Sequence, residues 1–111
     1  MKNVTSEALD TLSRLIAFPS VSSASNVEIT KYVDEILRSL GFETELTTYL
    51  DAKGIQKANV LAKRMPSESR GSLTGGVAYF CHTDVVPARG WVGPHPESPG
   101  DAFQATFTIQ R

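Results

Sequence analysis

The apolar segment 77–81 constrains the fold of this chain more than any other feature of its sequence. All five of its residues are apolar, and the glycine pair Gly75 and Gly76 precedes it. The shortness of the run and the preceding glycines favour a strand over a helix. A strand without alternating polar residues has no face suited to water, so we expect it at the centre of a sheet that is covered on both sides.

Two polar side chains that can bind metals, His82 and Asp84, follow this expected strand. Open α/β sheets place their ligand sites at the carboxyl ends of such strands. Side chains two residues apart on a strand point to the same side, roughly 6–7 Å apart along the backbone. His82 is therefore able to hold a metal while Asp84 orients its ring. So short a pair also recurs by chance, and the alternative is a polar pair that only forms hydrogen bonds.

A first amphipathic helix is expected over residues 4–16, where apolar side chains recur at helical spacing. Thr5 is a suitable amino-terminal cap for it. Pro19 stops this helix by Phe18, because the residue before a proline is forced out of helical geometry. Residues 20–26 are small and polar, and we expect them to form a connecting loop.

A second amphipathic helix is expected to follow this loop. Ser25 and Glu28 have the spacing of a capping box, in which each side chain satisfies a free amide of the other residue. An apolar stripe then continues to residue 40. Gly41 suits the left-handed conformation that closes a helix.

A β-hairpin is expected next, because residues 42–50 alternate with a period of two and residues 58–63 form a second strand after a turn at 51–54. The carboxylates of Glu43 and Glu45 fall on the face of the first strand that is expected to be wet, and we interpret them as solvated. Residues 65–76 are expected to form a surface loop. Alternation over 103–109 predicts one further strand.

The composition excludes several classes of function. The chain has 111 residues, 41% hydrophobic composition and a net charge of −1, which predicts one domain or less and no nucleic acid or anionic membrane as partner. No apolar run approaches the roughly 18 residues that span a bilayer. Cys81 is the one cysteine. It excludes an internal disulfide, suits the reducing cytoplasm, and is interpreted as a buried structural thiol.

The string Cys-His-Thr-Asp-Val-Val-Pro-Ala at 81–88 resembles the first metal-binding motif of a family of zinc-dependent hydrolases. That family includes acetylornithine deacetylase, succinyl-diaminopimelate desuccinylase, the aminoacylases and glutamate carboxypeptidase. The similarity continues upstream, in the family's order, at 15–22, 40–42 and 58–62.

This resemblance implies an α/β fold with a three-layer, zinc-peptidase-like sheet. Residues 1–111 would be an incomplete amino-terminal portion of the catalytic domain: two helices, the hairpin and a central strand that ends at the metal motif. By resemblance His82 is a metal ligand, and Asp84 is the catalytic carboxylate that holds its imidazole. The complete enzyme would bind two zinc ions, with cobalt or manganese as substitutes, and the resemblance also allows a homodimer.

The family's other motifs do not occur in the sequence. A Gly-Arg-Gly-x-x-Asp element, whose aspartate bridges the metals, is expected directly beyond Arg111. A Glu-Glu pair that supplies the general base, an acidic ligand and a late histidine are expected later still. The segment Asp101-Ala102-Phe103 also departs from the family's usual Asp-Pro-Phe. The chain is therefore interpreted as a truncation that is inactive alone, and His95 as a loop histidine rather than a second ligand.

The parent protein is expected to cleave the amide bond of an N-acyl amino acid by attack of a metal-activated water. Two alternatives stay open. One is a di- or tripeptidase or carboxypeptidase of the same family, which would act on a short peptide. The other is a non-catalytic small α/β binding module, in which His82 and Asp84 form only a polar cluster.

Overall fold

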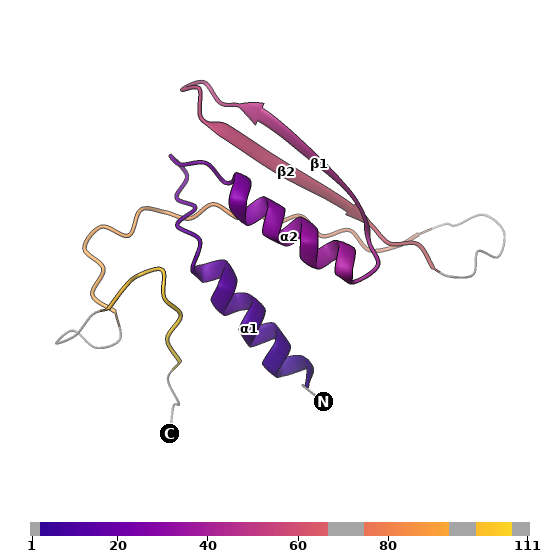
Figure 1. Ribbon diagram of the computed structural model, residues 1–111, viewed down its shortest axis with the longest axis horizontal. Coiled ribbons are helices and arrows are strands. Elements are labelled where there is room, and N and C mark those ends of the chain that lie inside the picture. The colour runs from indigo at the N-terminus through magenta and orange to yellow at the C-terminus, as the bar shows by residue number, and fades with distance from the viewer. Residues whose placement is uncertain (1–2, 67–74, 94–99, 108–111) are drawn as a thin grey trace.

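The structure of this protein is a computed structural model that describes residues 3–66, 75–93 and 100–107. The elements follow in the order α1 (Val4–Ile16), α2 (Val27–Ser39), β1 (Glu43–Leu50) and β2 (Gln56–Lys63). The two strands form an antiparallel sheet, and α2 packs against both of them, whereas α1 lies farther from the sheet (Figure 1). Within the described ranges, no helix combines the length and the apolar character needed to cross a membrane.

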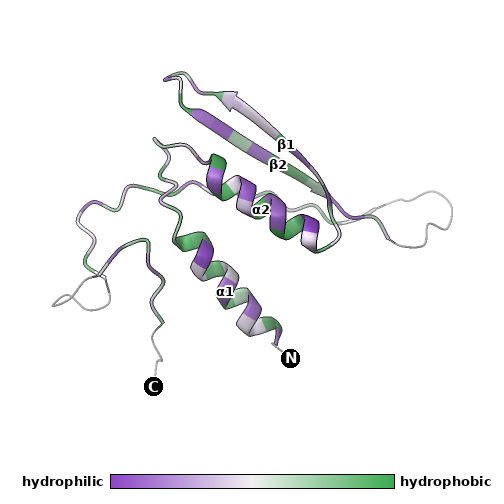
Figure 2. Cartoon of the chain, viewed as in Figure 1, coloured by the Kyte–Doolittle hydropathy of each residue, from purple (hydrophilic) through white to green (hydrophobic). Residues whose placement is uncertain are grey.

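Helix α1 confirms the predicted helix and shifts its cap. Asn3, not Thr5, caps it, because the Asn3 side chain accepts a hydrogen bond of 2.8 Å from the Ser6 amide. The helix ends at Ile16, three residues before Pro19. Apolar and polar residues alternate along both helices (Figure 2), but no residue of α1 is buried. Within the described part of the chain its apolar stripe is therefore half-buried at most.

Helix α2 supplies most of the core. Val27, Ile29 and Thr30 in its first turn are buried, and Gly41 follows the helix with a φ of +86°, as predicted. The capping box is wrong. The Ser25 hydroxyl accepts a bond of 3.2 Å from the Val27 amide, but Asn26 occupies the cap position.

The hairpin of β1 and β2 confirms the predicted strand pair, with β2 beginning two residues earlier than expected. Its turn depends on Asp51, whose carboxylate accepts hydrogen bonds from the Lys53 amide at 2.8 Å and the Ile55 amide at 2.9 Å. Gly54 takes a φ of +78° there, a conformation that few residues other than glycine adopt without strain. The aspartate and the glycine together fix the register, in which Thr48 lies opposite Ala58.

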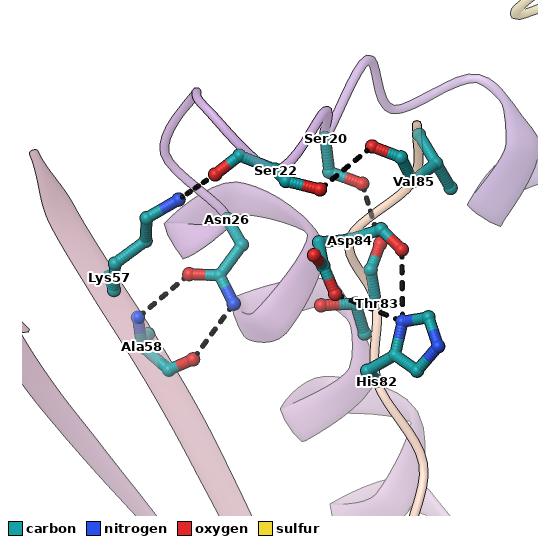
Figure 3. Close-up of polar contacts among 9 residues, drawn as sticks. All are labelled: Ser20, Ser22, Asn26, Lys57, Ala58, His82, Thr83, Asp84 and Val85. Atoms are coloured by element: carbon teal, nitrogen blue, oxygen red, sulfur yellow. Dashed lines mark hydrogen bonds and ion pairs between the residues drawn. The ribbon is translucent and has the colours of Figure 1, made fainter. Parts of the chain in front are cut away.

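The loop 20–26 is tied to the outer edge of β2. The Asn26 side-chain amide donates to the Ala58 carbonyl at 2.9 Å and accepts from the Ala58 amide at 2.8 Å (Figure 3). The Lys57 ammonium donates to the carbonyls of Ser22 and Ala24. Because Ala58 is only 1% exposed, water cannot replace the Asn26 bonds cheaply.

The predicted central strand does not form. Residues 77–81 are in no strand, and Val77, Tyr79 and Phe80 are 82%, 92% and 95% exposed. The prediction of a buried thiol is also wrong, because Cys81 is exposed. A strand that is apolar on both faces needs strands at its edges and layers above and below it. The described residues provide one two-stranded sheet. Among them, the segment 77–81 therefore lacks the neighbouring strands and covering layers that a central strand needs.

The strand predicted over 103–109 is also not seen within the described residues. A turn occupies residues 102–103, and the Asp101 carboxylate accepts a bond of 2.9 Å from the Phe103 amide. Residues 108 and 109 lie outside the described ranges, as do His95 and most of the surface loop predicted at 65–76.

The chain is extended for its length. Its radius of gyration is 17.7 Å, whereas a compact domain of this size has about 13 Å. The buried apolar residues of the described part are Val27, Ile29 and Ala58. The core therefore sits between the first turn of α2 and the start of β2, next to the loop 20–26.

We predict that Asn26→Ala lowers the free energy of unfolding by about 1–3 kcal/mol, because it leaves the Ala58 amide and carbonyl unpaired in a buried position. Urea unfolding followed by circular dichroism measures this change. The matched control is Asn59→Ala, which removes an exposed asparagine side chain from β2, next to Ala58. We expect this substitution to change the free energy of unfolding by no more than about 0.5 kcal/mol. Equal effects of the two substitutions would contradict the role of Asn26.

We predict that the hairpin loses stability in acid through Asp51. The pKa of Asp51 lies below its usual value of 3.8, chiefly because its carboxylate accepts the hydrogen bond from the Ile55 amide, with the Lys53 amide and nearby lysine charges adding to it. The unfolded chain therefore binds a proton at Asp51 more tightly than the folded chain does. The contribution of Asp51 to the free energy of unfolding is thus complete at pH values above 3.8, and it is lost as the pH falls through the lower pKa of the folded state.

The protection of the Ile55 amide from hydrogen exchange between pH 6 and pH 2 measures this loss. Asp51→Asn keeps an oxygen acceptor without a titrating group, so its acid limb should be flatter. The same acid loss in both proteins would exclude Asp51 as the cause.

Candidate metal site

The segment 82–85 is held in place by the loop 20–22. The Val85 amide donates to the Ser20 carbonyl at 3.0 Å, and the Ser22 amide donates to the Val85 carbonyl at 2.9 Å. These two bonds make a parallel bridge between Val21 and Val85, although the two segments are more than sixty residues apart in the chain. The predicted metal motif thus lies beside the loop 20–22, and the same loop is bonded to β2 through Lys57 and Asn26 (Figure 3).

His82 and Asp84 lie in direct contact, as their spacing predicts. The His82 Nδ1 atom is 2.9 Å from the Asp84 carboxylate and 3.0 Å from the Asp84 carbonyl oxygen. Since both neighbours are acceptors, Nδ1 is the hydrogen-bond donor in these contacts, and in the neutral ring this leaves the lone pair on Nε2. The second ring nitrogen points away from Asp84 (Figure 3). This is the tautomer in which an imidazole binds a metal through Nε2.

The surroundings of the Asp84 carboxylate favour its ionised form. Its pKa is below the usual 3.8, first because of a hydrogen bond from the Ser22 hydroxyl, with smaller contributions from the charge and the ring N–H of His82. Partial burial acts in the opposite direction. The Ser22 hydroxyl also lies 3.2 Å from the Val85 carbonyl, so its single proton serves one of the two acceptors at a time. An ionised Asp84 accepts hydrogen bonds only, which suits it to orient His82.

The described residues supply part of a zinc site. An imidazole with a carboxylate on its other nitrogen fits zinc chemistry, in which such carboxylates fix the ring and raise its basicity. A zinc site needs at least three protein ligands, and nowhere in the described ranges do three histidine, cysteine, aspartate or glutamate side chains gather to hold a cation. Cys81 does not extend the pair, because it forms no such group with His82 and Asp84 in the described part of the chain.

Two serines beside this pair were not identified from the sequence as functional residues. Ser20 is 4% exposed, and its hydroxyl donates to the Thr83 carbonyl at 2.7 Å. Ser22 contributes through its amide, which bonds Val85, and through its hydroxyl, which bonds Asp84. The sequence contains a signal for them, since both belong to the segment 15–22 that carries the family resemblance, but their small size and polarity are equally typical of any connecting loop.

Comparison with known proteins confirms the resemblance. The chain is 34% identical over 88 residues to the succinyl-diaminopimelate desuccinylase of Rickettsia canadensis (strain McKiel), which covers 79% of this chain and 21% of that protein. It is 34% identical over 77 residues to the acetylornithine deacetylase of Myxococcus xanthus, 69% of this chain and 20% of that protein. A third relative, the desuccinylase of Rickettsia massiliae (strain Mtu5), is 34% identical over 93 residues, 84% of this chain and 23% of the relative.

The chain spans about one fifth of the length of these curated relatives, which fits the expectation of an amino-terminal piece of such a protein. No family model matches the chain. No solved structure matches it significantly.

We predict that the neutral ring of His82 carries its proton mainly on Nδ1, because the Asp84 carboxylate and carbonyl both accept from that atom. Two-bond ¹H–¹⁵N NMR of the histidine rings distinguishes the two tautomers. Asp84→Ala removes the charged acceptor and should lower the Nδ1–H population of His82. The signals of His95 provide the control, since they should not respond. A wild-type His82 protonated mainly on Nε2 would contradict the observed geometry.

Proposed function

We propose, from the premise that this chain is related to the succinyl-diaminopimelate desuccinylases and acetylornithine deacetylases, that it is the part of a zinc-dependent amidohydrolase that contributes the first metal ligand. The observation that carries the proposal is the contact of His82 Nδ1 with the Asp84 carboxylate at 2.9 Å. It occurs within the string that resembles the family's metal-binding motif.

In this proposal His82 binds a zinc ion through Nε2, and Asp84 holds the ring. By accepting the Nδ1 proton, Asp84 keeps the imidazole neutral in the tautomer that can bind a metal, and it raises the basicity of Nε2. A bound zinc would supply a water activated for attack on an amide carbonyl. Two ions are expected in the complete enzyme, and cobalt or manganese would be able to replace zinc.

The proposed substrate is an N-acyl amino acid. Support for a deacylase over a peptidase comes from the names of the relatives, which are a desuccinylase and a deacetylase of small acylated compounds. A peptidase of the same family, acting on a short peptide, is the alternative. The cytoplasm is the proposed compartment, because the single cysteine suits a reducing environment.

The proposal includes a three-layer sheet in the longer protein. The exposed apolar side chains of Val77, Tyr79 and Phe80 would be buried there, once further strands and helices surround their segment. The chain alone would not catalyse the reaction, since one imidazole and one carboxylate do not complete a zinc site among the described residues.

We predict that this chain alone, supplied with zinc, does not hydrolyse N-succinyl-diaminopimelate or N-acetylornithine. A longer polypeptide that includes the downstream coding sequence should hydrolyse one of them and lose that activity to a chelator. In it, His82→Ala should lower kcat/KM by about a hundredfold or more, because it removes a metal ligand. Asp84→Ala should lower kcat/KM by about 10–100-fold, because it removes the carboxylate that orients the His82 ring.

The matched control is His95→Ala, which should leave the activity of the longer polypeptide unchanged. Activity that survives both His82→Ala and chelation would overturn the proposal. A longer polypeptide that binds zinc equally well with and without His82, and hydrolyses neither compound, would favour a non-catalytic module.

A further inference from the structure

We propose that Ser20 is a positioning residue for His82: its buried hydroxyl fixes the Thr83 carbonyl, in the segment that joins His82 to Asp84, and thereby sets where the imidazole stands. This inference rests on the proposed function, because the position of the ring matters only if His82 binds a cation. Ser20 would act through the backbone and would not itself touch a metal or substrate.

The local bonding pattern shows why a hydroxyl is needed at this position. In a regular parallel ladder, the bridge between Val21 and Val85 would continue with a bond from the Ser20 amide to the Thr83 carbonyl. The Ser20 amide instead donates to the Phe18 carbonyl at 2.8 Å. The Ser20 hydroxyl takes over the missing bond at 2.7 Å. The side chain of Ser20 thus completes a ladder that its own backbone leaves incomplete.

The segment that carries His82 has little else to hold it. Residues 77–81 form no strand and their large apolar side chains are exposed. Among the described residues, the bonds from 83–85 to other parts of the chain go to Ser20 and Ser22. The position of His82 therefore depends more on the loop 20–22 than on residues 77–81, which precede it in the chain.

The loop itself is well placed to act as a support. At its far end Asn26 pairs with the buried Ala58, and Lys57 donates to the carbonyls of Ser22 and Ala24. A continuous series of polar contacts consequently leads from β2 through the loop to Thr83 (Figure 3). This series reaches the candidate site at Ser22, whose hydroxyl bonds Asp84, and at Ser20, which is 4% exposed and bonds the Thr83 carbonyl.

The test is a zinc titration of the ¹⁵N-labelled chain, followed by the ring signals of its two histidines, His82 and His95. The wild-type chain should bind zinc at His82 at a lower concentration than at His95. Ser20→Ala should raise the apparent Kd at His82 by roughly fivefold, within the range that one net hydrogen bond sets, and leave His95 unchanged. Ser20→Thr keeps a hydroxyl and should retain most of the affinity. Ser23→Ala is the matched control, an exposed serine of the same loop.

The outcomes separate this inference from the proposed function. If zinc binds His82 no better than His95 in the wild type, the pair does not orient His82 for a cation in this chain and the inference fails, whereas the proposed function is tested separately by His82→Ala in the longer polypeptide. If His82 binds better and Ser20→Ala leaves that preference intact, the positioning role alone is overturned. A loss of the hairpin amide signals in Ser20→Ala would also overturn it, because the residue would then support the fold as a whole. Loss of affinity at His82 with an intact hairpin, and rescue by Ser20→Thr, supports it.

Discussion

The pairing of one side chain with one strand edge organises this structure. The amide of Asn26 presents a donor and an acceptor at nearly the spacing of a peptide group, so it bonds Ala58 as a neighbouring strand would. This pairing satisfies two backbone groups of a buried residue, which are costly to leave unpaired. It also fixes the loop that follows α1, and the loop in turn holds Val85. Asn26 thereby helps to hold together β2, the loop 20–26 and the segment around Val85, which lie far apart in the sequence.

The two helices and the hairpin could be predicted from the sequence because each is specified locally. The turn at Asp51 and Gly54 needs only residues within five positions of each other, and helical spacing needs only one face of α2 to be apolar. The segment 77–81 differs in kind. Its apolar pattern predicts a strand only if other strands lie beside it and layers cover both of its faces. The described part of the chain does not supply those strands and layers.

In the candidate site, too, the local contact could be predicted from the sequence and the long-range one could not. His82 and Asp84 meet at a separation of two residues, and the sequence shows that separation directly. The role of Ser20 depends on the direction in which its own amide points, toward Phe18 and away from Thr83. No pattern of residue types specifies that direction. The cap at Asn26 was missed for a similar reason, since its side chain is engaged by a strand thirty-two residues away.

Exposure limits what the pair can do in this setting. The side chains of His82 and Asp84 are 83% and 45% exposed, so water competes for the donor and the acceptor of their hydrogen bond. The same hydrogen bond becomes stronger when it is removed from water, because its electrostatic attraction rises as the local dielectric falls. A protein layer over 77–85 would therefore do two things at once. It would bury Val77, Tyr79 and Phe80, and it would make Asp84 a firmer support for the imidazole, so completion of the fold and tightening of the candidate site would be one event.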